Sequence, residues 1–397
     1  MASHCGNRFA CHNVFRSLFI ASAKPCLPTR RFSSALAEQA KTLPVPQQKA
    51  DFHYYQQLLK QHAKMVHRKE SQLKAENLLR DMKQCGLEPN HQTYFHLVLG
   101  LSWLPHRNQH QNDRMESWFY EYLRLQRDPK RKRPQVKLKK LLKDMAIYGH
   151  PHLKTMFLHM VQLFEHELDS GCWNSAIKGC INAKQFEDAE HVFDMARERN
   201  VTRLSTYEIM IRAYLSNRDQ KASSRIFEYM IRDQITAKCS VYQSFIDFYT
   251  SLKPDKDTQQ TVARLWQAML IMTTDSRIPN DTIQKLLVYF RKNRQLAVAE
   301  QIYLDLKIRN QRLKKEHVKE MHSVIIGFAH RQQLPSALSI TYDLLADGYE
   351  LEDKVIYSVV EACIHRNDRE AAQQLVDMVN AVQPKGLSDA CHALLEQ

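Results

Sequence analysis

Two pairs of histidines are the features of this sequence that come nearest to a metal or catalytic site. His106 and His110 have the i, i+4 spacing that can place two ligands on one helix face. Pro105 and the Asn/Gln-rich surroundings favour a loop there. His150 and His152 flank a proline and have no third ligand near them. Because a zinc site needs three or four ligands, we predict neither a bound metal nor a cofactor.

Other signatures of catalysis are missing from the sequence. It contains no Gly-rich phosphate loop, no Gly-x-Ser-x-Gly motif and no paired-carboxylate motif. The cysteines form no Cys-x-x-Cys pair and match no disulfide framework, which favours a reducing compartment. No apolar run approaches the length of about 18 residues that a transmembrane helix needs. We therefore predict a non-enzymatic protein without catalytic residues or a membrane span.

Positive charge points to an anionic partner. The net charge is +14 and the pI is about 9.3, which favours nucleic acid first and then acidic lipid or acidic protein. The densest basic segment spans 127–143. Its candidate phosphate contacts are Lys130, Arg131, Lys132, Arg133, Lys137, Lys139 and Lys140. A nuclear import signal and a solvated loop are the alternatives for this segment.

A recurring helical signature provides the elements that must position these charges. Its clearest copies start at Ala75, Ala189, Ala299 and Ala337, each with an apolar residue three positions later. About nine copies occur at intervals of roughly 34 to 40 residues, a period that marks stacked helical hairpins. Few glycines and little strand-type alternation also favour helices. We predict an all-α solenoid of helix-turn-helix repeats.

One repeat shows the expected chemistry. Its first helix has an apolar face at i, i+3, i+4 and i+7, formed by Trp173, Ala176, Ile177 and Cys180. Its second helix has a small residue, Ala189, where the two helices should approach most closely. The equivalent positions elsewhere are Ala75, Ser223, Ala299, Ala337 and Ala372. Three copies have a larger residue, Met115, Leu153 or Val262, and looser packing is predicted there.

One junction between repeats identifies a family. The sequence from Asp81 to Asn90 reads Asp-Met-Lys-Gln-Cys-Gly-Leu-Glu-Pro-Asn and is followed by Thr93-Tyr94. It resembles a pentatricopeptide repeat, whose second helix closes with Met and then Gly-Ile-x-Pro-Asp before a Thr-Tyr-Asn opening. The segment from Cys172 to Gly179 resembles the family's opening helix. The resemblance covers about 50–380 and implies a right-handed superhelical solenoid that binds organellar RNA.

The resemblance also implies which side chains face the bases. In the family about one base meets each repeat, read by the residue after the first-helix Tyr and by the residue that closes the unit. Carried over, the candidates are Gln56, Asn90, Phe95, Asn174, Glu208, Lys238, Gln243, Asn280, Gln284, His322 and Tyr357.

These candidates depart from the family's pattern. Only Asn174 is a typical reader. The apolar clamp two residues before the Tyr is replaced by Gln92, Gly171, Ser205, Ser240, Lys319 or Lys354. Without it a base loses stacking worth about 1–3 kcal/mol. Loose binding through phosphates, or a protein partner, is therefore favoured over a readable code, and a plain solvated side chain is the alternative for each residue.

The N-terminus has the composition of a mitochondrial transit peptide. The first 37 residues contain no Asp or Glu, but they include Arg8, Arg16, Lys24, Arg30 and Arg31. Arg30-Arg31-Phe32 also resembles a matrix-processing site, while a secretory signal and an untargeted N-terminus are the alternatives. We predict a transit peptide at 1–32, a linker at 33–49, a repeat array at 50–383 and a C-terminal cap at 384–397.

Together these features predict a binding protein of the mitochondrial matrix. Its expected partner is single-stranded mitochondrial RNA, whose stability, processing or translation it would support. The alternative is a protein scaffold or assembly factor that contacts the mitoribosome or RNA-processing proteins.

Overall fold

The chain folds into helices throughout the part that the structure describes. The computed structural model describes residues 52–64, 69–104, 106–126, 135–164, 168–272, 277–383 and 393–394. These residues contain eighteen long helices and no strand. The predicted all-α fold of about nine helical hairpins is confirmed.

The helices pair in chain order, and each pair is one repeat. The first helices are α3 (Phe52–Lys64), α5 (His91–Ser102), α7 (Gln135–Ile147), α9 (Ser170–Asn182), α11 (Leu204–Ser216), α13 (Cys239–Ser251), α15 (Asn280–Lys292), α17 (Lys315–His330) and α19 (Asp353–His365). The second helices are α4 (Lys69–Gln84), α6 (Gln109–Gln126), α8 (Leu153–Phe164), α10 (Phe186–Glu198), α12 (Gln220–Arg232), α14 (Lys256–Met272), α16 (Leu296–Ile308), α18 (Leu334–Ala346) and α20 (Arg369–Val382).

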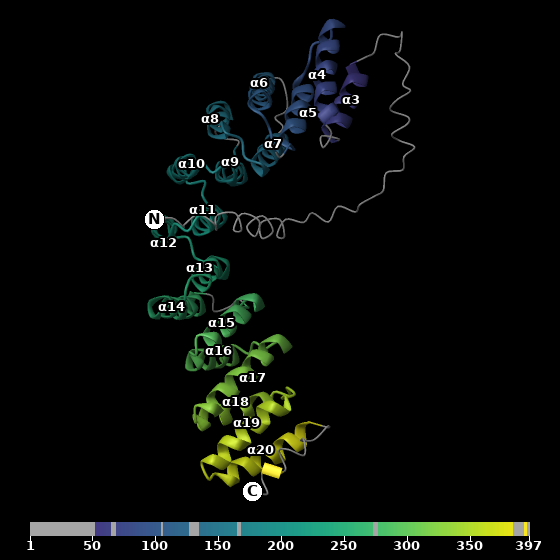
Figure 1. Ribbon diagram of the computed structural model, residues 1–397. Helices are drawn as coiled ribbons and strands as arrows, with labels where there is room; N and C mark the ends of the chain where they lie inside the picture. Colours follow the sequence, from purple (N-terminus) through teal and green to yellow (C-terminus); the bar gives the residue numbers. More distant parts are fainter. Residues whose placement is uncertain are drawn as a thin grey trace, which may run out of the picture. The chain divides into compact units, whose positions relative to one another are not determined.

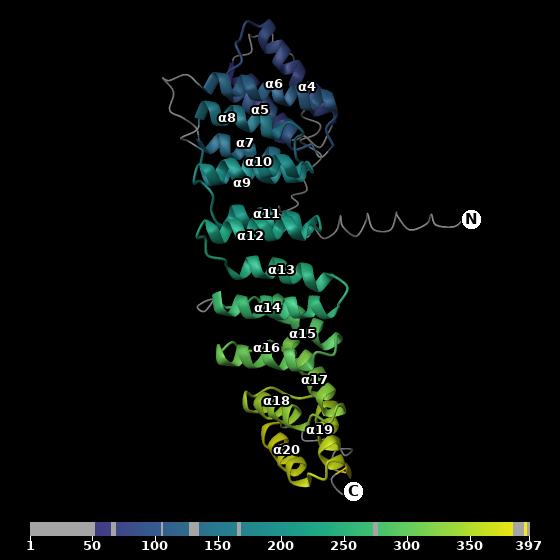
Figure 2. The same ribbon diagram turned by 90° about the vertical axis from the view of Figure 1, so that its left-hand side faces the viewer.

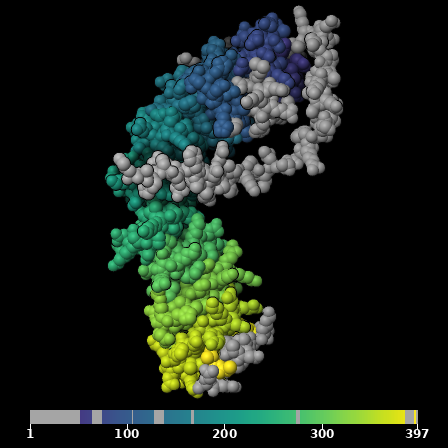
Figure 3. Space-filling model, in the orientation of Figure 1, coloured from purple at the N-terminus to yellow at the C-terminus, as the bar shows by residue number. Residues whose placement is uncertain are grey.

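First and second helices form two layers. From α5 to α19 each first helix packs on the next first helix, and the second helices lie on one side of them (Figure 1). Successive repeats follow one another in chain order in the space-filling view (Figure 3). This nearest-neighbour stacking is how helical hairpins that cannot bury their apolar faces alone obtain a continuous core.

The core contains the residues that the helical period predicts. Trp173, Ala176, Ile177 and Cys180 are all buried on α9. Aromatic edges join neighbouring helices. The Phe157 and Trp173 rings meet edge-on with centroids 4.9 Å apart, and Phe193 meets the next repeat's Tyr207 at 5.2 Å. These aromatic contacts add to the burial energy and fix one repeat against the next.

The small residues of the second helices lie at close helix contacts, as predicted. Ala189, Ser223, Ala299, Ala337 and Ala372 have no exposed surface. The larger residues Met115, Leu153 and Val262 are equally buried, and the looser packing predicted for their repeats stays a prediction. At Leu153 the reason for the burial is visible: Gly179 on α9 has no side chain at the point where the leucine packs.

Helix ends are tied to the preceding repeat. Asn182 at the end of α9 donates 2.6 Å to the carbonyl of Ala146 at the end of α7, and Arg331 donates 3.1 Å to the carbonyl of Arg294. Such side chains satisfy the carbonyl groups that a helix C-terminus leaves without an intrahelical partner. They therefore fix the register between successive first helices.

Two kinds of feature are absent from the described residues. None of their helices has both the length and the apolar character that a bilayer crossing requires. No cluster of three or more His, Cys, Asp or Glu side chains in the same residues could hold a metal ion.

Candidate nucleic-acid interface

Several predicted base-facing side chains bond to the next repeat. Gln56 donates 2.6 Å to Thr93 Oγ1 and 3.2 Å to Asn90 Oδ1. Asn174 Nδ2 donates 3.0 Å to Ser205 Oγ. These bonds run along the layer of first helices and occupy groups that would otherwise be available to a nucleotide.

Two further candidates take part in the same pattern. The Glu208 carboxylate accepts a hydrogen bond from the hydroxyl of Ser240 in the next repeat. Gln284 Nε2 donates 3.4 Å to Glu320 Oε1 on α17. The first helices are thus joined by a row of hydrogen bonds at the positions that the family resemblance assigns to base reading.

The candidates that close a repeat lie at the starts of first helices. Asn90 caps α5 and accepts from the backbone N–H of Thr93 at 3.1 Å, so its oxygen stabilises the helix end. Lys238 is exposed at the N-terminus of α13. Asn280 begins α15, and its backbone oxygen lies 3.2 Å from the Nε2 of His317.

Four candidates differ in exposure. Phe95 is buried, with its ring centroid 6.1 Å from that of Tyr122. His322 is buried too, and this burial lowers the pKa of its imidazole despite the nearby Glu352 carboxylate. Gln243 and Tyr357 are half-buried. The assignment of these residues to base contact stays a prediction.

The predicted basic segment is only partly described. Lys130, Arg131, Lys132 and Arg133 lie outside the described residues, as does the side chain of Lys137. Lys139 on α7 pairs with Asp169 at 2.5 Å, and Asp169 caps α9. Lys140 is exposed. Among the predicted phosphate contacts, Lys140 is thus exposed and Lys139 is already paired with the carboxylate of Asp169.

A row of exposed cations on three consecutive first helices is a feature that the sequence reading missed. It consists of Lys143 on α7, Lys178 on α9 and Arg212 on α11, which we call the first-helix cation row. Each lies one helical turn after Lys139, Asn174 or Glu208. Side chains four residues apart share a helix face, so the row runs beside the hydrogen-bonded positions. Aligning the repeats four residues further along would have found it.

Charge differs between the two helix layers. The first helices contain fourteen Lys and Arg against eight Asp and Glu, a net charge of +6. The second helices contain fifteen against eighteen, a net charge of −3. We therefore expect a polyanion to bind the first-helix layer in preference to the second-helix layer.

The two histidine pairs have structural contacts. His110 lies in α6 rather than in the predicted loop, which includes only His106. His150 is fully buried and accepts the backbone N–H of His152 at 3.1 Å through Nδ1. His152 in turn lies 2.8 Å from Glu116. These contacts hold the α7–α8 connection against α6.

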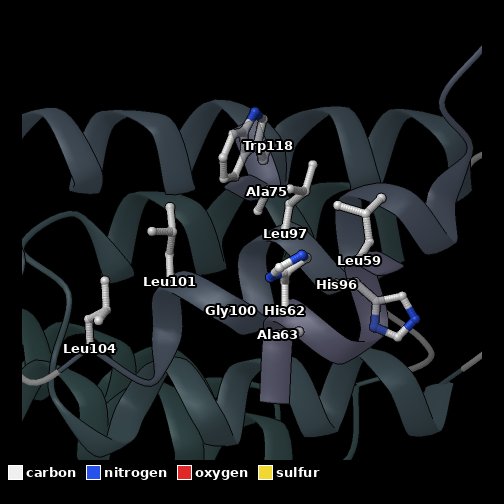
Figure 4. Close-up of a pocket in the computed structure, with 10 residues that line it drawn as sticks. All are labelled: Leu59, His62, Ala63, Ala75, His96, Leu97, Gly100, Leu101, Leu104 and Trp118. Atoms are coloured by element: carbon white, nitrogen blue, oxygen red, sulfur yellow. The ribbon is translucent and has the colours of Figure 1, made fainter. Parts of the chain in front are cut away.

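A small pocket lies between the first four helices (Figure 4). Its walls are mainly apolar and include Leu59, Leu97, Leu101 and Trp118, with His62 as a polar member. Burial and the charge of Lys74 lower the pKa of His62. The pocket thus offers hydrophobic contact and a largely neutral imidazole, and no charged residue lines it.

A family model matches one of the helical hairpins described above. The family model described as "PPR repeat" matches residues 171–201, which comprise most of α9 and all of α10. This stretch is a pentatricopeptide repeat. The match confirms the repeat signature that the sequence predicted at these residues, and the matched repeat contains both Asn174 and Lys178.

Solved structures with pentatricopeptide repeats resemble the chain at low identity. The crystal structure of PPR10 from maize matches with a TM-score of 0.43 and 14% identity, over 91% of this chain and 47% of that one. PPR10 in complex with an 18-nucleotide psaJ RNA element matches with a TM-score of 0.39 and 14% identity, over 94% and 53%.

A further solved structure resembles the chain less. The Cut9–Hcn1 hetero-tetramer of the APC/C matches with a TM-score of 0.29 and 11% identity, over 87% and 71%. The chain spans about half the length of the PPR10 chains that it matches. No curated protein matches the sequence.

Proposed function

We propose that this protein is a non-enzymatic, RNA-binding helical-repeat protein of the mitochondrial matrix. It binds single-stranded RNA along its first helices and supports the stability, processing or translation of that RNA. The observation that carries the proposal is the first-helix cation row, in which Lys143, Lys178 and Arg212 recur at equivalent positions of three adjacent repeats.

The spacing of the row suits a nucleic-acid backbone. The three first helices pack side by side, and packed helices lie about 8–10 Å apart. Exposed cations at that repeat distance provide a track for a chain of phosphates, whose binding releases condensed counterions. Lys143 and Lys178 make no ion pair among the described residues, so their charge is available to a ligand.

The proposed binding depends weakly on base sequence. Asn174, Glu208 and Gln284 already bond to the next repeat, so reading a base would cost those bonds. These three side chains are half-buried, and a typical hydrogen bond contributes about 0.5–1.5 kcal/mol to stability. Phosphate contacts by Lys143 and Lys178 require no such exchange, and Arg212, which donates from Nε to Ser244 Oγ at 3.1 Å, keeps its other guanidinium N–H groups for a phosphate. We therefore assign affinity to charge and give the hydrogen-bonded residues a mainly structural role.

Reversing charge in the row is expected to weaken RNA binding strongly. For the double variant Lys143→Glu/Lys178→Glu, affinity for a single-stranded oligonucleotide should fall at least about tenfold at low salt. The slope of log affinity against log salt should become shallower by about 1 to 2, because two phosphate contacts contribute about 0.7 each for single strands. Fluorescence anisotropy over a salt series measures both quantities.

A matched pair on the other layer provides the control. Lys83 on α4 and Lys221 on α12 are exposed lysines of second helices. The variant Lys83→Glu/Lys221→Glu changes net charge equally but should keep the wild-type affinity within about twofold. Equal losses in the two double variants would show that only net charge matters, and would contradict the proposed first-helix track.

The mitochondrial location can be tested separately. Residues 1–37 fused to a fluorescent protein are expected to direct it into mitochondria, because the segment combines several arginines with no acidic residue. Changing Arg8, Arg16, Arg30 and Arg31 to glutamine should leave the fusion in the cytosol. Import assayed with isolated mitochondria gives the same readout, and undiminished import of the glutamine variant would contradict the assignment.

A further inference from the structure

An apolar groove opens in the second-helix layer between α12 and α14. The residues that line it include Phe227 and Ile231 from α12, Tyr242 and Phe245 from α13, and Leu265 and Ile271 from α14. Viewed from the second-helix side, α13 is visible between α12 and α14 (Figure 2). The floor of the groove is thus α13, whose Tyr242 and Phe245 keep only 5% and 6% of their surface exposed.

This junction differs from its neighbours in its contacts. Elsewhere, adjacent second helices are bridged by side chains. Examples are Lys154 to Asp188 at 2.8 Å, Trp266 Nε1 to Asp305 at 2.7 Å, and the Tyr120 and His159 rings at 5.1 Å. Here the side chains have other partners: Arg225 of α12 pairs with Glu190 of the preceding repeat, and Trp266 of α14 bonds to Asp305 of the following one. The two repeats are connected through the packing of α11 on α13 and through α12, whose Phe227 ring contacts Tyr242 and Phe245 of α13.

The rims of the groove carry large apolar side chains in solvent. Ile231 is 58% exposed, Ile271 71% and Met272 50%. Each continues the apolar surface of the groove. In a free monomer these large apolar side chains remain in water and gain no free energy of burial. Exposed apolar patches of this kind usually mark a protein-interaction site.

The two helices that flank the groove carry more basic than acidic residues, and Glu228, the charged residue that lines the groove itself, lies 4.0 Å from Arg232. α12 and α14 together contain five Lys and Arg against two Asp and Glu, whereas the other seven second helices contain ten against sixteen. Lys221 and Arg264 are exposed and make no ion pair among the described residues. An occupant with acidic residues beside an apolar face would complement this charge.

We propose that the groove between α12 and α14 binds an amphipathic helix of another protein, with acidic residues flanking its apolar stripe. Parallel helical walls and an apolar floor suit a helix-in-groove contact, in which anchors at i, i+3, i+4 and i+7 enter the groove. The helix supplies the second-helix packing that this junction lacks. This surface is separate from the RNA track on the first helices.

A designed peptide provides the probe. It has about 18 residues, so that as a helix it is about 27 Å long, close to the 17 residues of α14. Leucines occupy the i, i+3, i+4 and i+7 positions, and glutamates flank them. A second peptide keeps the leucines and has lysines in place of the glutamates. Binding of each to the full chain is measured by fluorescence anisotropy.

The expected result is selective binding at the rims. The glutamate peptide should bind at least about tenfold more tightly than the lysine peptide, and Ile231→Glu/Ile271→Glu should reduce its affinity at least about tenfold. Ile308→Glu is the matched control, because Ile308 is a 78% exposed isoleucine on α16 that does not line the groove. It should change affinity by less than about twofold, and all variants should melt like the wild type.

Four outcomes would overturn the proposal. These are no binding of the glutamate peptide, equal binding of both peptides, equal losses in the groove and control variants, and displacement of the peptide by an RNA oligonucleotide. Sedimentation tests a second copy of this chain as occupant. A dimer that Ile231→Glu/Ile271→Glu abolishes would assign the groove to self-association instead.

Discussion

Replacing Gly179 by valine is expected to lower the free energy of unfolding by about 3 kcal/mol. A Cβ at this position on α9 would lie 1.9 Å from Leu153 Cδ2 and 3.1 Å from the Ala146 Cα. Leu153 can rotate, but it is fully buried and has little space to enter, and Ala146 is part of the α7 backbone. Urea denaturation of the full chain, followed by circular dichroism, measures the loss.

A second helical glycine provides the control for this prediction. A Cβ at Gly327 would approach only side-chain atoms of Leu296, the nearest at 2.8 Å. Gly327→Val should therefore cost about 1 kcal/mol, since one flexible side chain can adjust. Adding Leu153→Ala to Gly179→Val should recover part of the stability. Equal costs at the two glycines, or strict additivity of the double variant, would contradict the close contact of α7, α8 and α9.

Acidification is expected to destabilise the protein through His150. Burial, followed by the positive charge of Arg107, lowers the pKa of this imidazole from its ordinary value of 6.5 to about 4. Between these values the unfolded chain binds a proton that the folded chain does not. Stability therefore falls as the pH drops from 6.5 to 4, by about 3 kcal/mol for this one group, and is fully retained above 6.5.

The variant His150→Gln isolates this contribution. Glutamine can replace both contacts of the ring, which accepts from the His152 N–H at 3.1 Å and lies 3.4 Å from the Asn112 oxygen. Stability measured between pH 4 and 7 should depend less steeply on pH in this variant than in the wild type. His110→Gln, at an exposed position of α6, should keep the wild-type slope. Parallel curves for wild type and His150→Gln would rule out a buried neutral imidazole.

The repeat pattern made much of the core predictable. Trp173, Ile177 and Cys180 were placed on one face by spacing alone, and all are buried. The helix period determines which residues share a face, and the apolar face is the one that packs on neighbouring helices. Local pattern therefore gives both the helices and their inward sides.

Contacts between repeats were harder to predict. Leu153 is larger than the alanine or serine at this position in other repeats, and Gly179, 26 positions further along, leaves the space that it fills. Likewise Asn174 matches a base reader in sequence, yet its amide bonds to Ser205 of the next repeat. Each of these pairings depends on how two helices face each other, and sequence spacing within one repeat carries no information about that.

The sequence by itself determined the class of structure and the sign of the charge. Periodic apolar residues, the Gly-Leu-Glu-Pro-Asn junction and an excess of Lys and Arg are local properties that need no coordinates. Only the tertiary structure showed where that charge lies, which reader positions are already bonded, and that α12 and α14 leave a groove. The physical reason is that these features arise from side chains about one repeat apart, whose distance is set by helix packing rather than by their order along the chain.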